Sequence, residues 1–409
     1  MSTLRPSQLW LRIFVPFAVG YFLSYLLRNV NAVIAPELVR ELNFSAADLG
    51  LLTSAYLAVF GAFQLPLGIL LDRYGPRRVE AALLVIAAIG ATLFALGHNL
   101  AELAFSRALI GLGVSACLMA SFKAFSLWFP MERQASLNSA IMAAGGLGAL
   151  TSSTPLSWAL SLIGWRGAFF GLAVLAMIAA ILIFTTPDKS ATASRESLID
   201  QLRGVGKVLT SFAFWRYAPQ TALVVGGFMA MQGLWAVPWL MNFNGLTRDA
   251  AALHLLLMSL GMMVGFVAIA TFVTRLAARG LKPEYILIVG MGCGMVVTLL
   301  IVIEGASSYP LWFAMGLVFS VGNLSYALLS AQFPMQLAGR VNTTLNLLTF
   351  VGAFAIQWGF GAAVDGFTAG GMSPHDAYQR TYAILLALQA LSYGWYILAG
   401  RRHLAGKGA

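Results

Sequence analysis

Charged residues are scarce in this sequence. Only 10% of its 409 residues are charged and 59% are hydrophobic, whereas about a quarter of the residues in soluble globular proteins carry charge. A chain of this composition is expected to be an integral membrane protein. Its two cysteines, Cys117 and Cys293, lie inside apolar runs, so we expect packing residues rather than a disulfide or a metal site.

Acidic residues are nearly missing from the interiors of the apolar runs. Glu102, Glu304 and Asp365 lie at or near the outer ends of their runs, and no histidine lies mid-run. We find no His/Asp cluster, no metal-ligand spacing and no nucleophile–base pair. The sequence therefore indicates neither an enzyme nor a bound cofactor.

Twelve apolar runs are long enough to cross a bilayer. A spanning helix needs about 20 residues, whereas a barrel strand needs only about 9–11. The runs lie near 13–35, 46–71, 79–97, 101–129, 135–163, 166–186, 217–241, 250–274, 284–303, 308–332, 343–364 and 380–399. We predict an all-α membrane protein with twelve transmembrane helices.

One long hydrophilic stretch, rich in Ser, Thr and charge, separates the first six runs from the last six. It predicts an N-terminal six-helix bundle at 1–186, a cytoplasmic linker at 187–216 and a C-terminal bundle at 217–409. The opening residues, MSTLRPSQLWLR, lead into the first run without a small-residue cleavage site, so no removable signal peptide is expected.

The basic residues set the orientation. If both termini lie inside, the inner loops hold eighteen of the 25 Lys and Arg residues and the outer loops hold four. The positive-inside rule then favours cytoplasmic termini. The net charge of +10 is explained by topology and indicates no nucleic-acid partner.

The two halves of the chain repeat one another. FPMERQASLNSAIMAAGGLGA at 129–149 and FPMQLAGRVNTTLNLLTFVGA at 333–353 share Phe-Pro-Met, an Asn and Gly-Ala at a constant offset of 204. A duplicated six-helix unit is expected to place its substrate site at the repeat interface, near the middle of the membrane.

The loop after the second run carries a family signature. GILLDRYGPRR at 68–78 resembles the cytoplasmic motif of the major facilitator superfamily, and RALIGLG at 107–113 resembles that family's fourth-helix motif. The resemblance implies two pseudo-symmetric bundles and alternating access, with helices 1, 4, 7 and 10 lining a central cavity. The gating residues it implies are Gly68, Asp72, Arg73, Gly75, Arg77, Arg78, Arg107 and Arg133.

Asp72 is the unusual residue of the first motif, since a carboxylate at a helix end requires a cationic or helix-N-terminal partner. The resemblance to the family implies that Asp72 holds the two halves closed on the cytoplasmic side. Its implied partners are Arg133 and the start of the eleventh helix. The alternative for the basic residues beside it is plain anchoring at the inner membrane surface.

Polar residues form a stripe on the first helix. They fall at i, i+3, i+4, i+7 and i+10, which is one helical face: Tyr21, Ser24, Tyr25, Arg28 and Asn31. The stripe faces either the cavity or neighbouring helices. A mid-bilayer cation costs roughly 2.5–3.5 kcal/mol even on a lenient scale, so we predict that Arg28 holds the negative group of a substrate.

Two further cations lie on the fourth run. Arg107 and Lys123 are 16 residues apart, so they point in different directions around the helix. Arg107 belongs to the family motif, while Lys123 either snorkels to the surface or joins the substrate site.

The first run also resembles that of organophosphate and organic-anion carriers in the same family. Those phosphate exchangers carry a second Arg on helix 7, whereas FMAMQGLWAVPWL at 228–240 offers only Gln232 and Trp235. A carboxylate or larger organic anion is therefore favoured over a phosphate ester. Candidate ligand contacts on helices 10 and 11 are Asn323, Ser325, Tyr326, Asn346 and Gln357.

Other functions stay open. A proton-coupled drug or metabolite exporter is the main alternative, although the carboxylate such pumps use is not found. A non-transporting sensor is more distant, because no cytoplasmic signalling domain is visible. We expect a monomer in the bacterial inner membrane, with any co-transported or exchanged ion undetermined.

Overall fold

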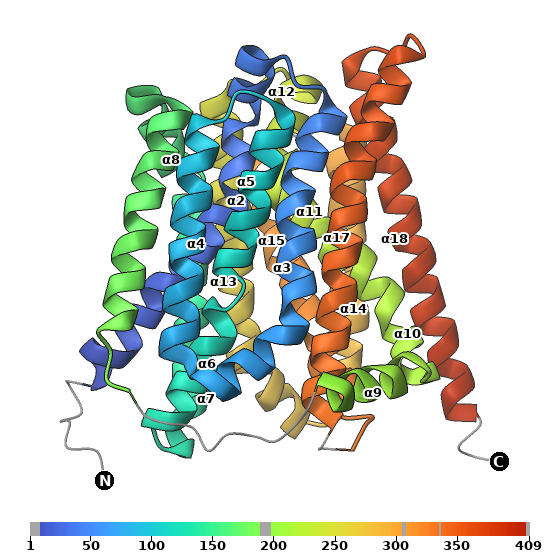
Figure 1. Ribbon diagram of the computed structural model, residues 1–409. Coiled ribbons are helices and arrows are strands. Elements are labelled where there is room, and N and C mark those ends of the chain that lie inside the picture. The colour runs from blue at the N-terminus through green and yellow to red at the C-terminus, as the bar shows by residue number, and fades with distance from the viewer. Residues whose placement is uncertain (1–8, 189–197, 305–307, 335–336, 406–409) are drawn as a thin grey trace. The chain divides into compact units, whose positions relative to one another are not determined.

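The computed structural model describes residues 9–188, 198–304, 308–334 and 337–405 (Figure 1). Within these ranges the chain is helical and contains no β-strand. Among the described residues, eleven helical stretches are long and apolar enough to cross a membrane. The predicted all-α membrane fold is confirmed.

The chain divides into two compact units. Unit 1 comprises Met1–Asn43 and Ala55–Leu198, and unit 2 comprises Phe44–Ser54 and Ile199–Ala409. The division near residue 198 falls in the stretch interpreted as a linker, of which 189–197 lie outside the described residues. The following segment is a helix, α9 (Leu198–Leu209).

Unit 1 contains the first six predicted spans. Its elements are η1 (Trp10–Phe14), α2 (Val15–Leu42), α3 (Ala46–Tyr74) from residue 55, α4 (Pro76–Leu96), α5 (Leu100–Val114), α6 (Cys117–Trp128), α7 (Met131–Thr151) and α8 (Thr154–Phe184). The fifth span runs through α7 into the start of α8. Gly164 then turns the chain with a φ of 66°, which separates the fifth span from the sixth.

Unit 2 contains the last six spans. Its seventh span is a composite of α10 (Phe212–Gln220), η2 (Thr221–Val225), α11 (Gly226–Ala230), η3 (Met231–Trp235) and α12 (Ala236–Asn244). The remaining elements are α13 (Arg248–Ala278), α14 (Pro283–Glu304), α15 (Tyr309–Phe319), η4 (Ser320–Asn323), α16 (Leu324–Ser330), α17 (Ala338–Ala369) and α18 (Pro374–Ala405).

The repeated Gly-Ala pairs mark the same helix contact in each unit. A Cβ on Gly148 of α7 would overlap the carbonyl oxygen of Phe22 on α2. A Cβ on Gly352 of α17 would overlap the carbonyl oxygen of Ala222 in η2. In both units the penultimate span therefore crosses the first span of that unit at a glycine, since no other residue permits so close an approach.

The first turn of α3 is capped within unit 2. The carboxylate of Asp365 on α17 accepts hydrogen bonds from the backbone N–H groups of Ala46 and Ala47, at 3.1 and 2.7 Å. A carboxylate satisfies otherwise unpaired N–H groups there and complements the positive end of the helix. This contact explains why residues 44–54 group with unit 2.

Candidate functional site

Arg28 lies in an aromatic setting within unit 1. Its Cζ is 4.7 Å from the ring centre of Tyr25 and 5.0 Å from that of Phe60 on α3. The hydroxyl of Tyr56, one turn before Phe60, lies against the same guanidinium. Aromatic faces attract a cation, and the side chains of Arg28 and Tyr25 both remain half-exposed.

The other polar residues of the α2 stripe contact neighbouring helices. The Tyr21 hydroxyl donates to Met142 Sδ at 3.7 Å, and the Ser24 hydroxyl donates to the Val114 carbonyl at 3.4 Å. Tyr21, Ser24 and Asn31 are all buried. The exposed part of the stripe is thus limited to Tyr25 and Arg28.

Arg107 braces the backbone of α2. Its Nη1 donates to the Leu27 carbonyl at 2.7 Å and its Nη2 to the Arg28 carbonyl at 3.4 Å, while its Cζ lies 4.8 Å from the ring centre of Tyr56. The side chain is fully buried. A planar guanidinium suits this double contact, which fixes the part of α2 from which Arg28 projects.

All four spans expected to line the cavity depart from regular α-helix, the first of them through the π-helical turn η1 at its start. The fourth span breaks at Ser115–Ala116 between α5 and α6, the seventh contains the π-helical turns η2 and η3, and the tenth contains the 3₁₀ turn η4. Such irregular turns occur often at functional sites and expose backbone groups to ligands.

Lys123 is held by Asp72. Its Nζ lies 2.7 Å from Asp72 Oδ1, and the two side chains are only 30% and 28% exposed. From sequence, Lys123 is expected either to snorkel to the membrane surface or to join the substrate site, and Arg133 is expected as a partner of Asp72. In this structure Lys123 forms an ion pair with Asp72. Arg133 is exposed on the first turn of α7.

We expect Lys123→Gln and Asp72→Asn to lower the melting temperature of the detergent-solubilised protein without weakening anion binding. A double-mutant cycle should yield a coupling energy of about 0.2–1 kcal/mol, the range measured for solvent-exposed ion pairs. If Lys123→Gln abolished anion binding instead, Lys123 would belong to the substrate site after all.

The remaining motif residues shape the turn between α3 and α4. Gly75 caps α4 with a φ of 79°, a conformation that favours glycine. Arg77 and Arg78 reach Asp188 at 3.3 and 3.2 Å. Gly68 is exposed on α3, and Arg73 is exposed with its Cζ 5.3 Å from the Tyr74 ring centre.

In unit 2, both candidate residues of the seventh span are buried. Gln232 Nε2 donates to the Ser259 hydroxyl at 3.1 Å, and Trp235 Nε1 donates to the Gln357 carbonyl at 3.0 Å. Trp235 is fully buried and packs on Phe360, with ring centres 4.8 Å apart. Both side chains therefore hold unit 2 together in this conformation.

The candidates of the tenth span differ from one another. Asn323 is exposed in η4, whereas Ser325 is buried in α16. The Tyr326 hydroxyl lies 3.2 Å from both Asn346 Oδ1 and Thr349 Oγ1 of α17. Two of the candidate ligand contacts, Tyr326 and Asn346, thus lie side by side within unit 2.

Two features were missed by sequence reasoning. The i, i+4 pair Tyr56 and Phe60 on α3 lies against Arg28, Tyr56 through its hydroxyl and Phe60 through its ring, which their spacing on a helix could have suggested. Glu80, at the start of α4, is fully buried, although position 80 lies at the polar edge of an apolar run. Among the described residues, no group of three or more His, Cys, Asp and Glu is placed to hold a metal ion.

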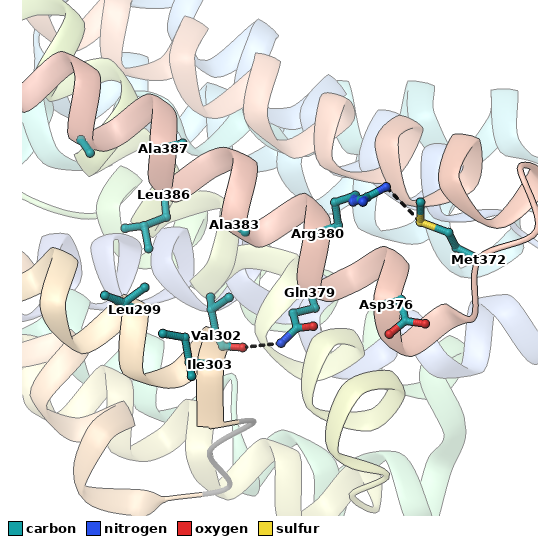
Figure 2. A pocket seen from close by; sticks show the side chains of 11 residues that line it. Leu299, Val302, Ile303, Met372, Asp376, Gln379, Arg380, Ala383, Leu386 and Ala387 are labelled. Carbon is teal, nitrogen blue, oxygen red and sulfur yellow. Dashed lines mark hydrogen bonds between the residues drawn. The ribbon is translucent and has the colours of Figure 1, made fainter.

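A groove of about 780 Å³ lies between α14 and α18 in unit 2 (Figure 2). At one end, Gln379 Nε2 donates to the Val302 carbonyl at 2.9 Å and Arg380 contacts Met372 Sδ. The rest is lined by apolar side chains such as Leu299 and Leu386. These helices are the ninth and twelfth spans, which are outside the set expected to line the cavity.

Comparison with known proteins gives the family. Residues 17–357 match the Major Facilitator Superfamily. The hexuronate transporter of Escherichia coli K12 is 31% identical over 168 residues, which cover 41% of this chain and 39% of that protein. The D-galactonate transporter of Escherichia coli O6:H1 is 21% identical over 418 residues, covering 95% and 96%.

Solved transporters share the fold. A bacterial homologue of the human lysosomal transporter Spinster, in an inward-facing and occupied conformation, matches with a TM-score of 0.75 and 15% identity over 97% of this chain and 98% of that one. A D-xylose–proton symporter matches with a TM-score of 0.74 and 17% identity over 94% and 96%. The chain belongs to the Major Facilitator Superfamily, and several of its relatives are named as transporters.

Proposed function

We propose that this chain is a secondary active transporter that moves a small organic anion, bearing a carboxylate or similar group, across the membrane by alternating access. The observation that carries the proposal is Arg28, a half-buried guanidinium in the middle of a membrane-spanning helix. A cation at this depth is stabilised by a negative group beside it, so a carboxylate is expected to bind there.

The segment 228–240 of the seventh span contains no Lys or Arg, which favours a ligand with one negative group over a doubly charged one. Gln232 is the polar side chain at the depth where phosphate exchangers carry a second arginine, and its amide donates to Ser259. Several relatives are named for anions with a single carboxylate: hexuronate, L-galactonate and D-galactonate. A sugar acid with a single carboxylate fits both observations.

The distribution of basic residues and the family support a membrane location and a topology. We propose a bacterial inner-membrane location with both termini cytoplasmic, since eighteen basic residues fall on that side against four on the other. The protein would act as a monomer in the lipid bilayer, with the anion as its small-molecule partner.

The test is a thermal-stability screen of the purified protein in detergent. D-glucuronate and D-galactonate should raise the melting temperature, because a ligand that binds the folded state stabilises it by mass action; at 100 times its Kd the gain is about 2.7 kcal/mol. The uncharged sugars D-glucose and D-galactose are the matched controls and should have no effect.

Other outcomes favour the alternatives. Stabilisation by lipophilic cations, with no response to sugar acids, would support the drug or metabolite exporter. Binding of a sugar acid without its uptake into liposomes would support the non-transporting sensor.

A further inference from the structure

Glu80 is a carboxyl group enclosed in the interior of unit 1. It lies on the first turns of α4 and has no exposed surface. Gly20 of α2 makes room for it, because a Cβ at that position would overlap Glu80 Oε1 and also meet Ile183 of α8. The group therefore sits where α2, α4 and α8 meet.

No cation lies beside this carboxyl group among the described residues, and neither carboxyl oxygen accepts a hydrogen bond from an N–H or O–H group of that part of the chain. The facing residues are Gly20 of α2, Ile183 of α8 and Cys117 of α6, whose thiol is a titratable neighbour. On α4 itself, Arg77 turns away to the Thr186 carbonyl at 3.0 Å and to Asp188.

Enclosure without a counter-charge decides the protonation state. Moving a carboxylate into an apolar interior costs far more than protonating it, so a buried, unpaired acid is held as neutral COOH. Should unit 1 loosen and admit water, the O–H bond would ionise and the proton would pass to water. Proton binding at this position is thereby tied to the packing of α2, α4 and α8.

The carboxyl group is also linked to the anion site. Gly20 lies eight residues before Arg28 on α2, roughly 12 Å along the helix. The helix α6, which begins at Cys117, packs against both α2 and α4. A change in the packing of α2 therefore reaches both groups.

We propose that Glu80 is the proton-binding site of this transporter and carries the proton that accompanies the anion; this rests on the function proposed above. With a neutral Glu80 and an anion on Arg28, the two groups and the ligand have no net charge. Removing either the proton or the anion leaves one uncompensated charge inside the membrane, which is costly.

The first test uses purified protein reconstituted into liposomes, with D-galactonate as the probe. Wild type should accumulate D-galactonate when the outside is acidic. Glu80→Gln, which imitates the neutral acid, should lose this accumulation but keep the exchange of labelled for unlabelled D-galactonate at equal pH. Glu102→Gln changes an exposed carboxylate of the same unit and should behave as wild type. Acid-driven accumulation by Glu80→Gln at the wild-type level would overturn the proposal.

A second variant shows whether the loss of accumulation comes from misfolding. Glu80→Met keeps the volume without a polar group, and replacing a buried ionisable group by an apolar one is often neutral or stabilising. It should fold and lose acid-driven accumulation in the same way.

A third measurement needs no transport. The infrared difference spectrum between acidic and alkaline samples should contain the C=O band of a neutral carboxyl, and Glu80→Gln should lack it. If D-galactonate is not moved by wild type, the proposed function fails, while the infrared band still decides whether Glu80 binds a proton. Absence of any band specific to Glu80 would overturn the inference.

Discussion

Arg28→Ala is expected to abolish measurable binding and uptake of carboxylate anions while the protein still folds. Truncating one partner of a desolvated, hydrogen-bonded charge pair costs about 2–5 kcal/mol, which is at least about a 30-fold loss of affinity. Folding should survive, because the change removes a cation from an apolar span rather than adding one. Isothermal titration with D-glucuronate and D-galactonate measures the loss.

Two further variants separate charge from geometry. Arg28→Lys keeps the charge but loses the planar fork, and we expect intermediate affinity. Arg380→Ala removes an exposed arginine of α18 that likewise lies near an aromatic ring, with its Cζ 5.6 Å from the ring centre of Phe367. It should bind as wild type. If Arg28→Ala bound the anion normally and only lowered the melting temperature, Arg28 would be structural.

Most of the fold was predictable because the membrane imposes it. Backbone groups in a bilayer must be satisfied within the helix, so long apolar runs identify spans directly. The predicted break between the fifth run, ending at 163, and the sixth, starting at 166, coincides with Gly164, whose positive φ turns the chain inside α8. The repeated Gly-Ala pairs lie at equivalent helix contacts in the two units, which agrees with the predicted duplication of a six-helix unit.

The site was less predictable, because pairing depends on neighbours far apart in sequence. Asp72 and Lys123 are 51 residues apart, and nothing in their local sequence indicates that they form an ion pair. Trp235 has the chemistry of a ligand contact, yet its indole N–H is donated to a carbonyl of α17. Glu80 shows the converse, since its burial depends on the space left by Gly20 of another helix.

The repeated glycines allow a prediction of large destabilisation. Gly148→Ala and Gly352→Ala each place a methyl group on a backbone carbonyl of the neighbouring span. A backbone cannot rotate aside as a side chain can, so the helices must separate. Overpacking costs about 1–3 kcal/mol, and here it outweighs the roughly 0.5–1 kcal/mol that alanine gains over glycine within a helix. Both variants should show clearly lower melting temperatures.

Matched controls lie in the same two units. At Gly171 of α8 and Gly394 of α18, an added Cβ would meet no atom of the described residues within 4 Å. Gly171→Ala and Gly394→Ala should therefore leave the melting temperature unchanged or raise it. Equal destabilisation by all four substitutions would show that lost flexibility, rather than close helix contact, explains the effect.

The two repeated glycines should differ in their effect on the anion. A Cβ on Gly148 would also press on Tyr25, whose ring packs on the Arg28 guanidinium. Gly352 lies in the other unit, where its Cβ would meet Ala222 of η2. Gly148→Ala should thus weaken D-galactonate binding beyond its effect on stability, whereas Gly352→Ala should lower stability with a smaller effect on affinity. The reverse order would place the anion nearer to unit 2 than to Arg28.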